Sequence, residues 1–76
     1  MKEVLEIIAK SLVDNPDEVS ITEVEGEQST ILELRVAAGD MGKVIGKQGR
    51  IARAIRTVVK AAASRESKHV VVEIIQ

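Results

Sequence analysis

The sequence predicts an α+β fold in which one three-stranded sheet carries its helices on one face. Three patterns predict it: a helical spacing of apolar residues near the amino terminus, two alternating segments after it, and a β-branched run near the carboxyl terminus. The resulting order is helix, strand, strand, helix, helix, strand. With 76 residues and a 45% hydrophobic composition, the chain can build one small core, so we expect a single domain over residues 1–76.

The first half of the chain predicts a helix followed by a pair of strands. Apolar residues recur at helical spacing over residues 2–13, namely at Val4, Leu5, Ile8 and Leu12. Pro16 ends this helix, because a proline pushes the preceding residue out of the helical region. Residues 19–24 and 31–38 alternate as strands do, and residues 26–28 are a suitable hairpin turn.

The second half predicts two helices and a last strand. Asp40 is a good N-cap for a short helix over residues 41–45. Residues 50–64 contain several alanines and neither proline nor glycine, so they predict the longest helix. Residues 70–75 are rich in β-branched side chains and predict the final strand.

Charge is divided sharply along the chain, although the net charge is only −1. Residues 1–40 carry ten acidic and three basic side chains, a net charge of −7, and residues 66–76 add −1. Residues 41–65 carry seven basic side chains and no acidic one, a net charge of +7. This asymmetry favours a localised anion-binding surface, and the alternative is a solvated basic helix face. The complete lack of aromatic residues disfavours an RRM sheet or an OB-fold groove, which stack bases on aromatic rings.

Composition argues against several other classes of protein. There is no cysteine, one histidine and no metal-ligand spacing, so we expect no metal site, no cofactor and no enzyme activity. The lack of cysteine fits a reducing cytoplasm. No apolar run approaches the ~20 residues that cross a bilayer, and no signal peptide opens the chain. We therefore expect a cytoplasmic protein with no membrane partner.

Two glycines three positions apart join the two predicted helices, in Gly46-Lys47-Gln48-Gly49. A tight connection of this kind needs backbone conformations that glycine adopts cheaply. A loop poor in side chains also lets another backbone approach, and amides at the start of the next helix favour a phosphate. Helix capping without any ligand is the alternative. Neither the Walker loop nor the dinucleotide fingerprint fits, because Gln48 follows Gly46-Lys47 and Val44 stands where the fingerprint needs glycine.

The run VIGKQGRIARAIRTVV, residues 44–59, in this order of elements resembles the GXXG loop and following helix of a type II KH domain. The resemblance covers essentially the whole chain and is to the small, stand-alone bacterial members of the family. It implies a non-catalytic protein that grips the backbone of single-stranded RNA, acting as a post-transcriptional regulator or RNA chaperone. It also implies a homodimer, and a heteromer with a larger protein that carries its own KH domain.

The resemblance and the basic segment together give a set of candidate RNA-binding residues. They are Gly46, Lys47, Gln48 and Gly49 in the loop, Val44, Ile45 and Ala52 in an apolar groove for bases, and Arg50, Arg53, Lys43 and Arg35 around them. Family members often have a large aliphatic residue at the position of Ala52, so we expect a shallower groove here. Arg35 either reaches a base edge or pairs with a nearby glutamate, which is Glu23, Glu25 or Glu33.

The long helix has more apolar surface than one sheet can cover. Three cations form its basic face: Arg53, Arg56 and Lys60. The apolar arc spans about 200°, roughly twice the stripe that a helix needs to cover a sheet. We predict that the side of the arc turned away from the sheet is a homodimer interface, made of Ile51, Ala54, Val58 and Ala61. The alternative is that the first helix or a loop covers it.

A second function stays open at the level of sequence. The same scaffold could serve as a protein-interaction domain that dimerises with a KH partner, with RNA contact incidental. A saturable RNA complex at physiological salt distinguishes the first function from the second.

Overall fold

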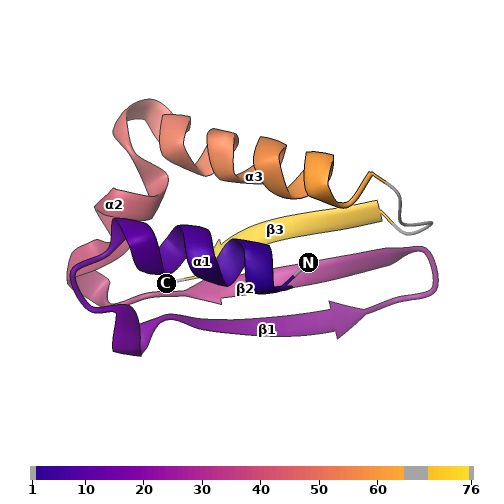
Figure 1. Ribbon diagram of the computed structural model, residues 1–76, viewed down its shortest axis with the longest axis horizontal. Helices are drawn as coiled ribbons and strands as arrows, with labels where there is room; N and C mark the ends of the chain where they lie inside the picture. The colour runs from indigo at the N-terminus through magenta and orange to yellow at the C-terminus, as the bar shows by residue number, and fades with distance from the viewer. Residues whose placement is uncertain (1, 65–68, 76) are drawn as a thin grey trace.

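The computed structural model describes residues 2–64 and 69–75. Within these residues the helices and strands are α1 (Lys2–Leu12), β1 (Ser20–Glu25), β2 (Ser29–Arg35), α2 (Met41–Ile45), α3 (Arg50–Ala62) and β3 (His69–Ile75). Short 3₁₀ turns connect them at η1 (Pro16–Glu18), η2 (Ala38–Asp40) and η3 (Lys47–Gly49). The predicted fold class and order of elements are therefore confirmed (Figure 1). Arg65, which belongs to the basic segment, lies outside the described residues.

The element ends differ from the predicted ones where turns intervene. The second strand starts at Ser29, two residues early, because the amide of Gly26 donates a 2.7 Å hydrogen bond to the carbonyl of Ser29 and closes the hairpin. It ends at Arg35, since the chain then enters the η2 turn. The long helix ends at Ala62, and the amide of Ala63 caps it by donating to the carbonyl of Val59.

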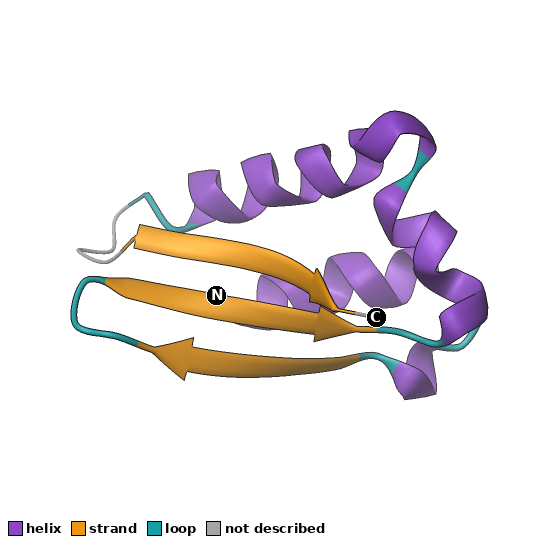
Figure 2. Ribbon diagram, turned by 180° about the vertical axis from the view of Figure 1, so that it is seen from behind, coloured by secondary structure: helices purple, strands orange, loops and turns teal. Residues whose placement is uncertain are grey.

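The sheet has the order β1-β2-β3 and mixes two kinds of pairing. β1 and β2 form an antiparallel hairpin with Ile21 opposite Leu34. β2 and β3 run parallel, with Leu34 opposite Ile74. A parallel pair requires a long crossover, and α2, η3 and α3 provide it. Figure 2 shows that the helices cover one face of the sheet and leave the other face open.

The core lies between the sheet and the three helices. Its buried residues come from every layer: Leu5 and Ala9 in α1, Ile21 in β1, Leu32 and Leu34 in β2, Val44 in α2, Ile55 and Val59 in α3, Ala63 after it, and Val70 and Val72 in β3. The predicted alternation in the second strand is confirmed, because Leu32 and Leu34 are fully buried while Arg35 is exposed. This core holds α3 against the sheet through Ile55 and Val59.

Asp40 does not cap the short helix as predicted. It stands before α2 but makes no side-chain cap hydrogen bond. Its carboxylate, only 2% exposed, instead accepts hydrogen bonds from the amides of Asp14 (3.3 Å) and Asn15 (3.0 Å) and from Asn15 Nδ2 (3.2 Å). Burial raises the pKa of Asp40, but these donors outweigh it and hold the pKa below its ordinary value. Asp40 thereby fastens the segment after α1 to the start of α2.

Candidate nucleic-acid interface

The loop between α2 and α3 is held in backbone conformations that favour glycine. Gly46 (φ 74°) and Gly49 (φ 74°) both have positive φ. At Gly46 there is also no room, because an added Cβ would lie 2.5 Å from Cγ1 of Ile51. At Gly49 an added Cβ would meet open space, so only the backbone angle demands glycine there. Gln48 adopts the left-handed region as well (φ 57°), which is uncommon for a residue with a side chain.

Two amides at the start of the long helix are bonded within the loop. The amide of Gly49 donates to the carbonyl of Gly46 (3.2 Å), and the amide of Arg50 donates to the carbonyl of Lys47. The expectation that this helix start offers its amides to a phosphate therefore fails for these two. The side chains of Lys47 and Gln48 are exposed at the tip of the loop, so a ligand can reach the tip from solvent.

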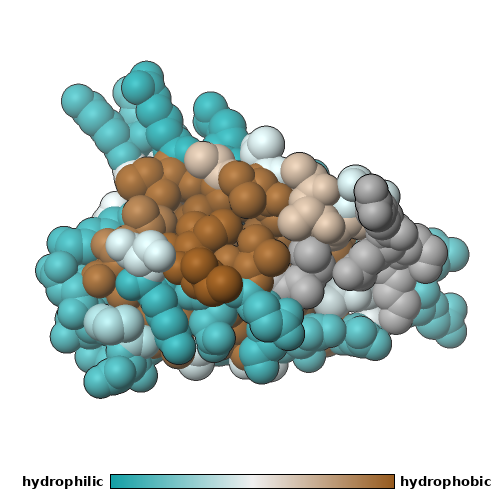
Figure 3. All heavy atoms as spheres, viewed as in Figure 1, coloured by the Kyte–Doolittle hydropathy of each residue, from teal (hydrophilic) through white to brown (hydrophobic). Residues whose placement is uncertain are grey.

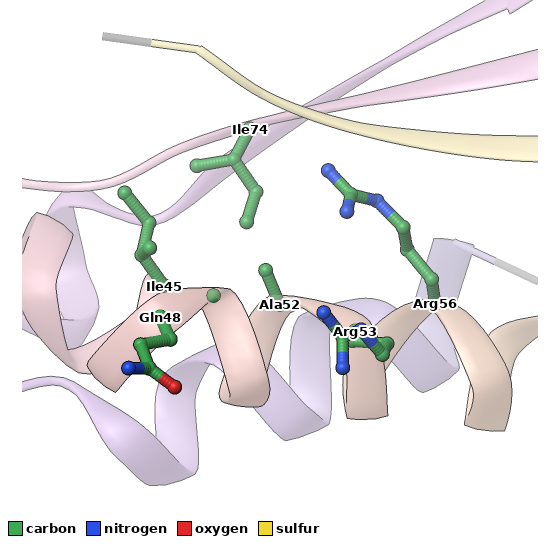
Figure 4. A pocket seen from close by; sticks show the side chains of 7 residues that line it. Ile45, Gln48, Ala52, Arg53, Arg56 and Ile74 are labelled. Atoms are coloured by element: carbon green, nitrogen blue, oxygen red, sulfur yellow. The ribbon is translucent and has the colours of Figure 1, made fainter.

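A pocket of about 410 Å³ opens beside the loop, between α3 and the end of β3. It is lined by Ile45, Gln48, Gly49, Ala52, Arg53, Arg56 and Ile74. Figure 4 shows Ala52 on α3 and Ile74 on β3 pointing toward one another, with Ile45 and Gln48 on one side and Arg53 and Arg56 on the other. The pocket therefore combines an apolar middle with two cations and the glycine loop.

Five of the predicted RNA-binding residues line this pocket: Ile45, Gln48, Gly49, Ala52 and Arg53. Val44 does not, because it is fully buried in the core. Lys43 is exposed on α2, where its Nζ pairs with a carboxylate oxygen of Asp14 at 3.4 Å. Arg50 lies at the loop but lines a different groove, described below.

Arg35 lies away from the pocket, on the open face of the sheet. In the parallel register Arg35 is opposite Ile75, whereas the pocket residue Ile74 faces the helices. The guanidinium of Arg35 pairs with the carboxylate of Glu33 at 3.7 Å and donates to the hydroxyl of Thr22 at 3.5 Å. Pairing with a nearby glutamate is one of the two roles that the sequence predicts for Arg35.

Two pocket residues were not among the candidates, Arg56 and Ile74. The basic face of the long helix already contained Arg56, so its spacing from Arg53 was a usable signal. Ile74 had no such signal. It reaches the pocket because β3 pairs in parallel with β2, and the position of a strand in a sheet cannot be read from its own residues.

An apolar groove of about 400 Å³ lies on the other side of α3, where α1 packs against it. It is lined by Ile8 and Leu12 from α1 and by Arg50, Ile51, Ala54, Ile55 and Val58 from α3. The space-filling view shows a continuous hydrophobic patch over these two helices (Figure 3). The first helix forms a wall of the groove without closing it, because Val58 remains 48% exposed. Ala61, the fourth predicted interface residue, is exposed one turn further along α3.

The described residues contain no cluster of three or more histidine, cysteine or acidic side chains that could hold a metal ion. None of the helices in residues 2–64 is long and apolar enough to span a bilayer.

A helix–strand–strand–helix–helix–strand chain, with a GXXG turn between its second and third helices and a parallel pair formed by its last two strands, is a type II KH domain. A family model described as the KH domain of KhpA/KhpB matches residues 2–74, and the chain belongs to this family.

Curated relatives match over most or all of their length. The chain is 76% identical over 75 residues to the RNA-binding protein KhpA of Clostridium acetobutylicum, covering 99% of this chain and 100% of that protein. It is 73% identical over 75 residues to the RNA-binding protein KhpA of Clostridium perfringens, with the same coverage. The KhpA of Aquifex aeolicus is 53% identical over 76 residues, which are 100% of this chain and 96% of the relative. No solved structure gives a significant match.

Proposed function

We propose that the chain is a single KH domain that binds single-stranded RNA without catalysing a reaction, and that it acts in the cytoplasm as a post-transcriptional regulator or RNA chaperone. The relatives named above are RNA-binding proteins, which supports RNA as the ligand. The observation that carries the proposal is the exposed loop tip, where Lys47 and Gln48 stand beside a pocket that two arginines line. Phosphate oxygens lie against this tip and its cation, and a base enters the pocket.

The charges around the pocket support the same proposal. Arg53 and Arg56 line the pocket, and Lys47 is exposed at the loop. The acidic residues 1–40 contribute no side chain to the lining of this pocket. A grip on about three phosphates gives a slope near −2 in a plot of log affinity against log salt. One small domain with so few contacts binds weakly, and two linked copies raise the overall affinity.

Replacing both Lys47 and Gln48 by Asp tests the loop. We expect loss of saturable binding to single-stranded RNA in fluorescence anisotropy, because two carboxylates at the tip repel phosphate. Circular dichroism should stay unchanged, since both side chains are exposed and outside the core. A matched control, Lys2→Asp with Gln28→Asp, makes the same change of charge at exposed positions outside the loop and should leave binding measurable. Undiminished binding by the Asp double variant would remove the loop from the proposal.

A second proposal concerns partners, and the groove between α1 and α3 favours it. Ile51, Ala54 and Val58 form one side of an apolar surface that the chain itself leaves open. A two-fold homodimer places the same patch of both copies face to face, and alanines on α3 permit close approach of the two helices. A larger protein that carries its own KH domain would compete for this surface. Dimerisation without any RNA affinity would leave the chain a protein-interaction domain.

A further inference from the structure

Arg56 is held differently from its neighbour in the pocket. Its Nε donates a 3.3 Å hydrogen bond to the carbonyl of Val72, so the side chain extends from α3 to β3. Figure 4 shows it rising from the helix toward the strand, beyond Ala52 and Ile74. Within the described residues, the guanidinium of Arg53 has no hydrogen-bond or ion-pair partner. The strand therefore orients one of the two pocket arginines and makes no such bond to the other.

This orientation leaves a defined set of donors for a ligand. A guanidinium is planar and carries five N–H groups in a fixed fork. With Nε directed to the carbonyl of Val72, the two terminal nitrogens remain as a pair of neighbouring donors. Such a pair matches two adjacent acceptors in one plane, as arginine does when it binds guanine O6 and N7.

The rest of the pocket suits a flat apolar ring. Ile45, Ala52 and Ile74 provide aliphatic contacts in its middle, and the volume of about 410 Å³ lies in the range of small-molecule sites. Arg56 stands beside these side chains, so a base lying against them would present one edge to its guanidinium. No aromatic side chain exists in the chain to stack on that base, so hydrogen bonds to its edge have a larger share in selecting it.

We propose that Arg56 is the specificity-determining residue of this pocket and selects a base with two adjacent acceptors, which means guanine (O6 and N7) or cytosine (O2 and N3). Neither adenine nor uracil has two adjacent acceptors on one edge, so either base leaves one terminal nitrogen of Arg56 unmatched. The inference rests on the proposed function, because it assumes that a base enters the pocket. Arg53 and Lys47 supply attraction to phosphate that is independent of sequence.

The experiment measures anisotropy with four labelled octanucleotides of RNA, oligouridine and the same chain with one central cytosine, guanine or adenine. Wild type should bind the cytosine variant, the guanine variant or both about tenfold more tightly than it binds oligouridine and the adenine variant. A tenfold difference is what one bidentate contact provides. Comparing the cytosine and guanine variants identifies which base is chosen. Arg56→Lys keeps the charge but loses the fork, so the preference should fall below about twofold. The matched variant Arg53→Lys also keeps its charge, so it should affect all four complexes alike and keep the preference.

The outcomes separate the two proposals. Equal, saturable binding of all four oligonucleotides by wild type would overturn the role of Arg56 and leave RNA binding standing. An unchanged preference in Arg56→Lys would show that the bond to Val72 serves only to cover the strand edge, and would also overturn it. Failure of wild type to bind any of the four would remove the proposed function and this inference together.

Discussion

The two sides of α3 carry opposite kinds of surface although they belong to one helix of 13 residues. The side toward β3 ends in a pocket with two arginines, the glycine loop and a small apolar middle. The side toward α1 is a groove lined almost entirely by aliphatic side chains, with Arg50 at the loop. The arginine-lined pocket attracts a polyanion. The apolar groove is instead stabilised when another apolar surface covers it and removes it from water. Changes to one side should therefore leave the other side working.

Gly46→Ala should break this independence and have the largest effect. The new Cβ meets Ile51, which lines the apolar groove, while the preceding residue, Ile45, lines the pocket. Overpacking and the positive φ together should lower the free energy of unfolding by about 2–4 kcal/mol. Gly49→Ala is the matched control: its Cβ has open space, so the cost should be about 1–2 kcal/mol. Urea denaturation measures the loss of unfolding free energy in both variants. Equal losses would mean that the side chain of Ile51 moves aside without an energetic penalty.

Val58→Asp should damage only the groove side. A carboxylate in the centre of an apolar interface loses its water without gaining a partner, so self-association should weaken at least about 100-fold. Analytical ultracentrifugation measures the mass, and anisotropy measures RNA binding by the single subunit, which should persist. Thr57→Asp adds the same charge at a neighbouring exposed position that does not line the groove, and its mass should equal that of wild type. An identical mass for Val58→Asp and wild type would exclude this groove as the dimer interface.

Asp40→Asn should have the smallest effect and touch neither surface directly. The depressed pKa of Asp40 means that its charged form stabilises the fold. That contribution is complete above the ordinary aspartate pKa of about 4 and is lost as the pH falls through the lower pKa of the folded state. The urea midpoint of the variant should therefore lie below that of wild type by a constant amount from pH 7 to pH 5. The gap should close below about pH 4, and a gap that persists there would assign the loss to geometry instead of charge.

The sequence predicts what local pattern controls. Apolar spacing in α1, the β-branched run in β3 and the glycine pair lead directly to the observed order of elements. The excess apolar arc of α3 likewise anticipates an open groove, since Val58 is exposed.

The sequence does not predict the side-chain positions that depend on long-range packing. Asp40 has the residue type and position of a cap, yet its carboxylate meets amides 26 and 25 positions earlier in the chain. Val44 adjoins the loop but turns into the core, and Ile74 reaches the pocket only through the parallel pairing of β3. Each of these depends on neighbours that are distant in sequence, which the pattern of a single segment does not encode.

The parallel pairing of β2 with β3 also sets the order of events while the chain is being made. Leu32 and Leu34 leave the ribosome well before Val72 and Ile74, which are their partners in the finished sheet. During that interval the hairpin of β1 and β2 lacks its third strand, and a two-stranded hairpin is at best marginally stable in water. Folding of this domain therefore waits for the last strand to be synthesised, and a message cut short before β3 yields a product that cannot complete its sheet.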